Sequence, residues 1–159
     1  MIIKDLKFFS QNIRKNSSFV HTILEMYYDF DIIFIQEPSW TTLCLVPSSK
    51  SKEGEELVRV LSHSNWMTFA RLSSVEDDHP CVISYINIRL LPLCFSLHND
   101  IFNHRDISLI SFFNNNFLFY LINIYSDSSQ TALKYLKNTG VSINNASITM
   151  GNFNICNSL

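Results

Sequence analysis

Apolar and polar positions along this chain follow a pattern that predicts mainly β-strands, with two segments of helical periodicity. Residues 6–12 predict a first strand. From Ser17 onward, apolar side chains recur every three to four positions as far as Tyr28, which predicts a helix that Ser17 or Ser18 can cap. Residues 31–37 predict a second strand. A strand, a helix and a second strand in this order favour a right-handed crossover between parallel strands.

The middle of the chain predicts several further strands. Residues 41–56 have the composition of a loop, and residues 55–64 predict a short helix. Apolar runs then predict strands at 66–72, 81–88, 93–97, 106–113 and 117–125. The three asparagines at 114–116 suit the turn of a hairpin, because Asn tolerates positive φ.

The last part of the chain predicts a helix and a final strand. The helix is expected at 126–140, capped by Asp127 or Ser128 and closed by Gly140, and the strand at 146–154. This order of elements predicts a single domain of the α/β (α+β) class, a layered sandwich of two mixed β-sheets flanked by helices. The chain has only three glycines, so it contains neither a G-x-G-x-x-G motif nor a P-loop.

Composition narrows the class of protein further. Charged residues make up 16% of the 159 residues and the net charge is −2, so a polybasic nucleic-acid-binding protein is excluded. The four cysteines share no C-x-x-C spacing, which argues against a zinc site or a redox pair. The first residues do not form a signal peptide, and no apolar run reaches the roughly 18 residues of a membrane span. The expectation is an intracellular protein, nuclear or cytoplasmic and not secreted, without a membrane partner.

Polar side chains that can bind a metal ion or a phosphate follow four of the predicted strands: Asn12, Glu37, Tyr125, and the pair Asn152 and Asn154. Each alone has a simpler interpretation, since an Asn at a strand end is usually a turn residue and a Glu is usually a solvated charge. If the first two strands are parallel neighbours, however, Asn12 and Glu37 emerge at one rim. In layered α/β proteins that rim is where ligands bind.

The tripeptide His104–Arg105–Asp106 matches the start of the protein-kinase catalytic loop, H-R-D. That loop needs Asn five residues after the Asp, and Ser111 stands there instead. Because the chain also lacks a glycine-rich loop, we exclude a kinase and interpret His104 and Asp106 as a turn before the next strand.

The ordered series of motifs resembles the endonuclease/exonuclease/phosphatase superfamily, and within it the endonuclease domain of non-LTR retrotransposons, fungal ones in particular. The resemblance extends over essentially the whole chain. It rests on the segments FFSQNIRKN, DFDIIFIQEPSW, YINIRL, DIFNHRDISLISF, INIYSDSSQTALKYLK and ITMGNFNI.

The resemblance implies a role for each candidate residue. Glu37, with Asn12 beside it, would hold a catalytic Mg²⁺, a hard cation that prefers oxygen ligands and keeps several waters. Tyr125 would face the scissile phosphate and Asn154 would hydrogen-bond to it. The implied activity is Mg²⁺-dependent nicking of DNA by phosphodiester hydrolysis. The implied partners are DNA and the reverse transcriptase of the parent element.

Two departures from the family pattern bear on activity. The catalytic aspartate of the family's G-D-F-N motif is Asn152 here, and a neutral amide cannot act as a general base. The family's later aspartate and S-D-H-type histidine motif are absent, so residues 1–159 correspond to about the N-terminal two-thirds of one such domain. We therefore expect a truncated, catalytically impaired copy. The alternative is a non-catalytic remnant that at most binds the DNA backbone.

Overall fold

The structure of the chain is a computed structural model. It describes residues 5–39, 63–71, 79–91, 93–114, 117–140 and 147–153, together with the backbone of 43–47 and 56–60.

The first of two four-stranded sheets has the order β1-β2-β6-β5 and is mixed. Its strands are β1 (Phe8–Asn12), β2 (Ile32–Gln36), β5 (Trp66–Phe69) and β6 (Val82–Asn87). β1 and β2 are parallel, with Asn12 opposite Gln36, whereas β6 runs antiparallel to β2 and to β5. The predicted parallel pair is thus confirmed, and Asn12 and Glu37 leave the sheet at the same rim.

The second sheet has the order β10-β9-β8-β7 and is also mixed. Its strands are β7 (Cys94–Leu97), β8 (Ile107–Asn114), β9 (Phe117–Ser126) and β10 (Ser147–Phe153). β8 and β9 form the expected antiparallel pair, with Asn114 opposite Phe117, although residues 115 and 116 of the predicted turn lie outside the described residues. β10 is parallel to β9, and this places Asn152 opposite Tyr125.

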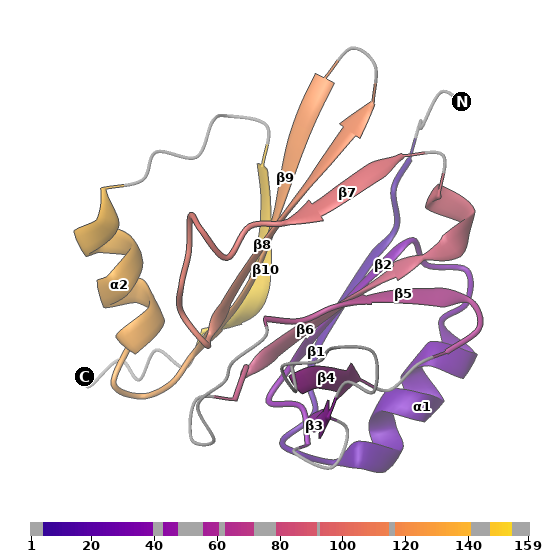
Figure 1. Ribbon diagram of the computed structural model, residues 1–159, viewed down its shortest axis with the longest axis horizontal. Coiled ribbons are helices and arrows are strands. Elements are labelled where there is room, and N and C mark those ends of the chain that lie inside the picture. The colour runs from indigo at the N-terminus through magenta and orange to yellow at the C-terminus, as the bar shows by residue number, and fades with distance from the viewer. Residues whose placement is uncertain are drawn as a thin grey trace, which may run out of the picture.

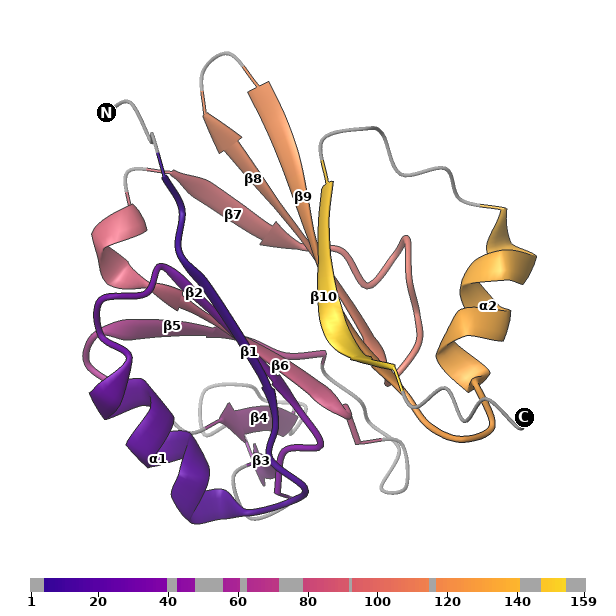
Figure 2. The same cartoon turned by 180° about the vertical axis from the view of Figure 1, so that it is seen from behind.

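The two sheets face one another, and each has a helix on its outer face (Figure 1; Figure 2). α1 (Ser17–Met26) buries Val20, Ile23 and Leu24 against the first sheet. α2 (Thr131–Thr139) buries Ala132 against the second sheet. The layers are therefore helix, sheet, sheet, helix, which confirms the predicted sandwich. Neither helix in the described ranges has the length and apolar character that a membrane span requires.

The predicted helix at 55–64 is wrong. Residues Glu56–Val60 form strand β4, which pairs antiparallel with β3 (Leu43–Pro47) inside the segment expected to be a loop. Two β-branched residues, Val58 and Val60, lie in this strand. Because a short apolar segment suits either element, pairing with a partner strand decides the outcome over local periodicity.

The expected helix caps are only partly correct. α1 begins at Ser17, but its N-cap is Asn16, so neither serine occupies that position. α2 begins at Thr131, five residues later than predicted, because β9 extends to Ser126 and a turn follows it. Its N-cap is Gln130, so neither Asp127 nor Ser128 occupies that position, although the Asp127 carboxylate accepts a 3.3 Å hydrogen bond from the Thr131 amide. Gly140 closes α2 with a φ of 61°, as expected. A short 3₁₀ helix, Ile88–Leu90, follows β6.

A buried hydrogen-bond network joins the two sheets across their apolar interface. The Gln36 amide group donates to Asn123 Oδ1 at 2.7 Å and to Ser10 Oγ at 3.1 Å. The Asn123 amide group in turn donates to the backbone oxygen of Ile83 at 2.9 Å. Gln36 is 1% exposed and Asn123 is 0% exposed, so water cannot replace these partners. The network consequently fixes how β9 lies against β2 and β6.

We expect Asn123→Leu to lower the free energy of unfolding by about 3 kcal/mol, because the buried Gln36 amide keeps only its bond to Ser10 and the Ile83 carbonyl loses the bond from Asn123. The matched control is Ser108→Ala, since Ser108 is paired with Asn123 in the sheet and its buried hydroxyl has no hydrogen-bond partner among the described residues. Chemical denaturation of both variants measures the difference. The control is expected to be as stable as the parent or slightly more stable. Equal losses in the two variants would contradict the role assigned to the network.

Candidate active site

Backbone hydrogen bonds tie the neighbouring rims of the two sheets together. The Glu37 amide donates to the Cys81 carbonyl at 2.8 Å, and the Cys81 amide donates to the Arg105 carbonyl at 2.8 Å. On the second sheet, the Tyr125 amide donates to the Asp106 carbonyl at 2.9 Å. Four chain segments that are far apart in sequence are thereby held at one place, and each supplies a polar side chain there.

Glu37 has an unusual backbone conformation with a φ of 49°. Its carbonyl accepts a 2.8 Å hydrogen bond from the Lys15 amide, so both of its backbone groups are engaged. Arg14 and Lys15, in the loop after β1, also have positive φ. Such conformations cost of order 1–3 kcal/mol each in non-glycine residues and concentrate at functional sites. Three of them at the shared end of β1 and β2 mark this rim as specialised.

A cavity of about 250 Å³ opens between the two rims. It is lined by Lys15, Glu37, Pro38, Pro80, Cys81, Arg105, Asp106, Tyr125 and Asp127. Burial, together with a hydrogen bond to the Glu37 carboxylate and its negative charge, raises the pKa of the Tyr125 hydroxyl to about 12. The hydroxyl therefore remains protonated at neutral pH and donates to Glu37. Two of the residues predicted from the sequence thus meet in this cavity.

Cys81 lies between the acidic groups of the cavity. Burial raises the pKa of its thiol to about 12, and a hydrogen bond to Asp106 and the charges of Asp106 and Glu37 add to this effect, while Arg105 opposes it. The thiol is consequently neutral at physiological pH, and a neutral thiol is a poor nucleophile. We assign Cys81 no chemical step. Glu37, Arg105 and Asp106 all affect the pKa of its thiol, and all three line the same cavity.

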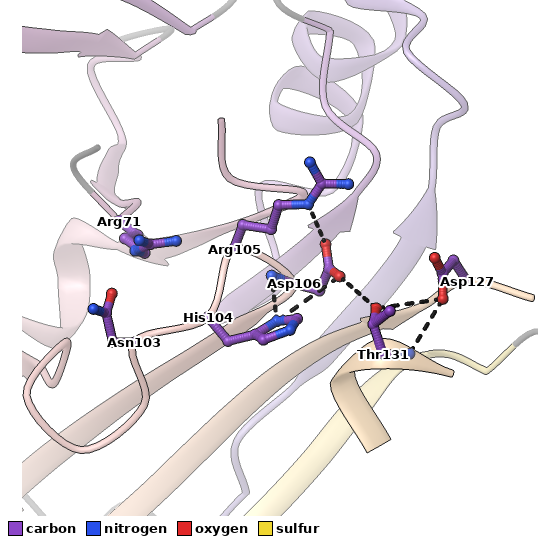
Figure 3. Close-up of a pocket in the computed structure, with 7 residues that line it drawn as sticks. All are labelled: Arg71, Asn103, His104, Arg105, Asp106, Asp127 and Thr131. Carbon is purple, nitrogen blue, oxygen red and sulfur yellow. Dashed lines mark hydrogen bonds and ion pairs between the residues drawn. The ribbon is translucent and has the colours of Figure 1, made fainter. Parts of the chain in front are cut away.

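Asp106 connects this cavity with a second one of about 300 Å³, lined by Arg71, Asn103, His104, Arg105, Asp106, Asp127 and Thr131 (Figure 3). The Asp106 side chain is 4% exposed. Its Oδ2 accepts a 3.2 Å hydrogen bond from the Thr131 hydroxyl, and its Oδ1 lies 3.5 Å from Arg105 Nε. The two cavities share Arg105, Asp106 and Asp127, so they form neighbouring parts of one polar surface.

Asn152 lies beside Tyr125 because β10 and β9 are parallel and pair these two residues. Met150, two positions earlier, packs between the sheets, so Asn152 is on the face directed toward the first sheet. β10 approaches β9 closely at Gly151, where a Cβ atom would lie 1.9 Å from the Ile124 carbonyl oxygen. A glycine before Asn152 is therefore a steric requirement of this position. Asn154 lies outside the described residues.

Asn12 is at the predicted rim but does not line either cavity. Its Oδ1 accepts a 2.9 Å hydrogen bond from the Arg14 amide, the arrangement of an Asx turn. This bond stabilises the positive-φ loop that carries Lys15. The proposed ligand role of Asn12 remains a prediction.

The donor groups of the cavity suit a hard divalent cation with few protein ligands. Within the described residues, no three His, Cys, Asp or Glu side chains are grouped closely enough to enclose a metal ion. Mg²⁺, however, commonly binds through one or two carboxylates and keeps its remaining waters. The Glu37 carboxylate, with those of Asp106 and Asp127 in the same cavity, matches that chemistry.

The sequence did not point to Arg105, Asp106 or Cys81 as site residues. His104 to Asp106 form the expected turn before β8, and this same turn delivers Arg105 and Asp106 to the cavity. Charged residues in a turn are normally solvated, so the sequence gives no reason to place Asp106 in a cavity. Only its burial in the structure distinguishes it from a solvated turn residue. That burial depends on the packing of α2, since Thr131 is its hydrogen-bond partner.

No protein-family model and no curated protein matches the sequence. Among solved structures, the chain is similar to the "Endonuclease domain of TRAS1, a telomere-specific non-LTR retrotransposon", with a TM-score of 0.53 and 11% sequence identity. The match covers 92% of this chain and 59% of that structure, so the chain spans less than two-thirds of that domain. At this low identity the similarity concerns the fold, and the layered sheets described above are those of a nuclease-like fold.

We expect Glu37→Gln to lower the pKa of Tyr125 from about 12 toward the ordinary value near 10, with the contribution from burial retained. A pH titration of the tyrosine side-chain carbons by NMR measures the change. Tyr85 is the control, because burial alone raises the pKa of its hydroxyl. Its titration should not move in the variant. An unchanged Tyr125 pKa would contradict the contact between Glu37 and Tyr125.

Proposed function

We propose that this chain carries part of a metal-dependent phosphodiesterase site that acts on DNA, of the kind found in non-LTR retrotransposon endonucleases. The observation that carries the proposal is that Glu37 and Tyr125, from the rims of the two sheets, line one cavity, with Asn152 paired to Tyr125. A carboxylate, a protonated hydroxyl and an amide at one place can bind a hard cation and the oxygens of a phosphate.

Each group has a role that its chemistry allows. Glu37 would hold the cation, which we propose to be Mg²⁺, and Asn12 and the carboxylates of Asp106 and Asp127 are further candidate ligands. When bound, such an ion polarises a phosphoryl oxygen and offsets the charge of the leaving oxygen. Tyr125, protonated at neutral pH, has one hydroxyl proton, which would face Glu37 in the free site and turn to the phosphate when the substrate binds. Asn154 is proposed as a second donor to that phosphate.

Asn152 limits what the site can achieve. A carboxylate at this position would orient or deprotonate the attacking water, whereas an amide has no useful basicity. Loss of a general base typically lowers the rate by about 10²- to 10⁴-fold. Asn is nearly isosteric with Asp, so the pairing of β10 with β9 is retained while hydrolysis is slowed. We therefore propose a catalytically impaired relative of the nicking enzymes.

The second candidate function is binding of the DNA backbone without cleavage. Lys15 and Arg105 line the first cavity, and Arg71 lines the second, so cationic side chains accompany the whole polar surface. Such contacts require no general base. A salt-dependent affinity for duplex DNA, without any Mg²⁺-dependent nicking, would favour this function over hydrolysis.

The nicking of supercoiled plasmid tests the hydrolytic proposal. Because the chain spans 59% of the similar endonuclease domain, the assay protein carries the unmatched part of that domain appended to residue 159. We expect Asn152→Asp in this protein to raise Mg²⁺-dependent nicking by about 10²-fold or more. Circular dichroism and thermal melting establish that the fused protein is folded before nicking is compared.

Glu37→Gln is the decisive companion variant. In the protein that carries Asn152→Asp, it removes the proposed metal ligand and is expected to abolish nicking. Asp29→Asn is the control, because the Asp29 side chain forms an exposed ion pair with Lys7 at the opposite end of the first sheet. Nicking that survives Glu37→Gln would refute the role of Glu37 and, with it, the proposed site.

A further inference from the structure

Two arginine–aspartate pairs of similar exposure lie at opposite ends of the sandwich. Arg89 pairs with Asp31 and Arg105 pairs with Asp106, with arginine side chains that are 44% and 45% exposed. The aspartates are 10% and 4% exposed. Since burial is alike in the two pairs, differences between them reflect how each guanidinium group is used.

The guanidinium group of Arg89 bonds only to other groups of the protein among the described residues. Its Nε donates to Asp31 Oδ1 at 2.9 Å, and its Nη2 lies 2.8 Å from the same oxygen and donates to the Asp29 carbonyl at 2.6 Å. Its Nη1 lies 3.5 Å from the Tyr28 carbonyl. Every nitrogen of this guanidinium group has a protein partner, so Arg89 is a structural residue that closes the start of β2.

Arg105 uses only one of its three guanidinium nitrogens. Its Nε lies 3.5 Å from Asp106 Oδ1, and within the part of the chain that the structure describes its Nη1 and Nη2 have no hydrogen-bond or ion-pair partner. In Figure 3 these two nitrogens point away from Asp106. Arg105 lines both cavities, so the unused edge of its guanidinium group is presented where the two cavities meet.

Asp106 is anchored independently of Arg105. Its Oδ2 accepts from the Thr131 hydroxyl at 3.2 Å, and its backbone carbonyl accepts from the Tyr125 amide at 2.9 Å. The Arg105 carbonyl is itself held by the Cys81 amide at 2.8 Å. The pair is therefore fixed at both its backbone and its carboxylate, which restricts where the guanidinium group can lie.

We propose that Arg105 is a phosphate-binding residue of this site, that its free Nη edge binds a DNA backbone phosphate beside the position of Glu37, and that Asp106 is the residue that positions it. This inference rests on the proposed function for the class of its ligand. A planar guanidinium group with two parallel N–H donors matches two phosphate oxygens better than a lysine ammonium group does. Buried Asp106 restricts the rotamers of Arg105 in advance, which lowers the entropy lost on binding.

The test measures the affinity of the chain itself for a short labelled DNA duplex by fluorescence anisotropy, in EDTA and over a range of salt concentrations. We expect Arg105→Gln to weaken binding about tenfold at low salt and to reduce the slope of log K against log salt by about one. Arg105→Lys should restore the slope, because it keeps the positive charge. It should restore only part of the affinity, because an ammonium group lacks the two parallel N–H donors of a guanidinium group.

Arg89→Gln is the matched control. It removes the same charge from a pair of equal exposure, but its guanidinium nitrogens already have protein partners at the far end of the sheet. We expect it to lower the melting temperature and to leave duplex affinity and salt slope unchanged in the folded protein. Equal weakening by Arg89→Gln and Arg105→Gln would mean that net charge alone governs binding, and it would overturn the proposal.

Asp106→Asn separates positioning from simple electrostatics. Removing a negative charge from a DNA-binding surface should strengthen binding if the charge acts only through the field of the protein. If Asp106 positions Arg105, the variant should weaken binding several-fold, and adding it to Arg105→Gln should cause little further loss. Tighter binding by Asp106→Asn would refute the positioning role. Thermal melting of each variant excludes unfolding as the cause.

The remaining outcomes separate this inference from the proposed hydrolysis. Weaker binding by Arg105→Gln, with no nicking by the extended Asn152→Asp protein, would support this inference and leave backbone binding as the function. Glu37-dependent nicking with unchanged affinity in Arg105→Gln would overturn this inference alone. Tight binding of inorganic phosphate without affinity for the duplex would assign Arg105 to a small anion and would also overturn it, as would the absence of any salt-dependent duplex affinity.

Discussion

The hydrogen bond between the buried amides of Gln36 and Asn123 is the constraint on which the rest of this structure depends. Apolar side chains hold the two sheets together, but apolar contacts are not directional and allow one sheet to slide over the other. An amide pair with no access to water has one favourable arrangement and a high cost for any other. The Asn123 amide also bonds to the Ile83 carbonyl, so the same group fixes the second sheet against two strands of the first.

The site follows from this registration of the sheets. Glu37 is the residue after Gln36, and Tyr125 is two positions after Asn123 on the same face of β9. Once the buried amides are paired, the next polar residues of each sheet meet at the rim, and Tyr125 hydrogen-bonds to Glu37. The turn before β8 adds Arg105 and Asp106, and backbone bonds through Cys81 tie that turn to the first sheet. Stability and chemistry thus depend on the same few contacts.

Much of the fold could be predicted from the sequence, because apolar runs separated by polar segments identify most of the strands. The strand–helix–strand unit also implies parallel pairing. The rim position of Glu37 followed from that unit alone. The prediction of a helix at 55–64 was wrong because pairing with β3 decides the conformation of this segment. The local sequence pattern carries no information about a partner strand. The roles of Asp106 and Arg105 were likewise hidden, since they arise from contacts with Thr131 and Cys81, which are distant in sequence. Asn123 and Gln36 are 87 positions apart, so nothing local indicates their pairing.

The central claim is that the joined rims form a site for a divalent cation at Glu37. The most direct measurement is a Mn²⁺ titration of the isotope-labelled chain by NMR, in which paramagnetic broadening marks the residues near the bound ion without any turnover. The account predicts that amide signals around Glu37, Cys81, Asp106 and Tyr125 broaden first, and that Mg²⁺ restores them. Broadening centred on Asp29 and Asp31 at the opposite end of the sheet, or uniform broadening over the whole chain, would contradict it.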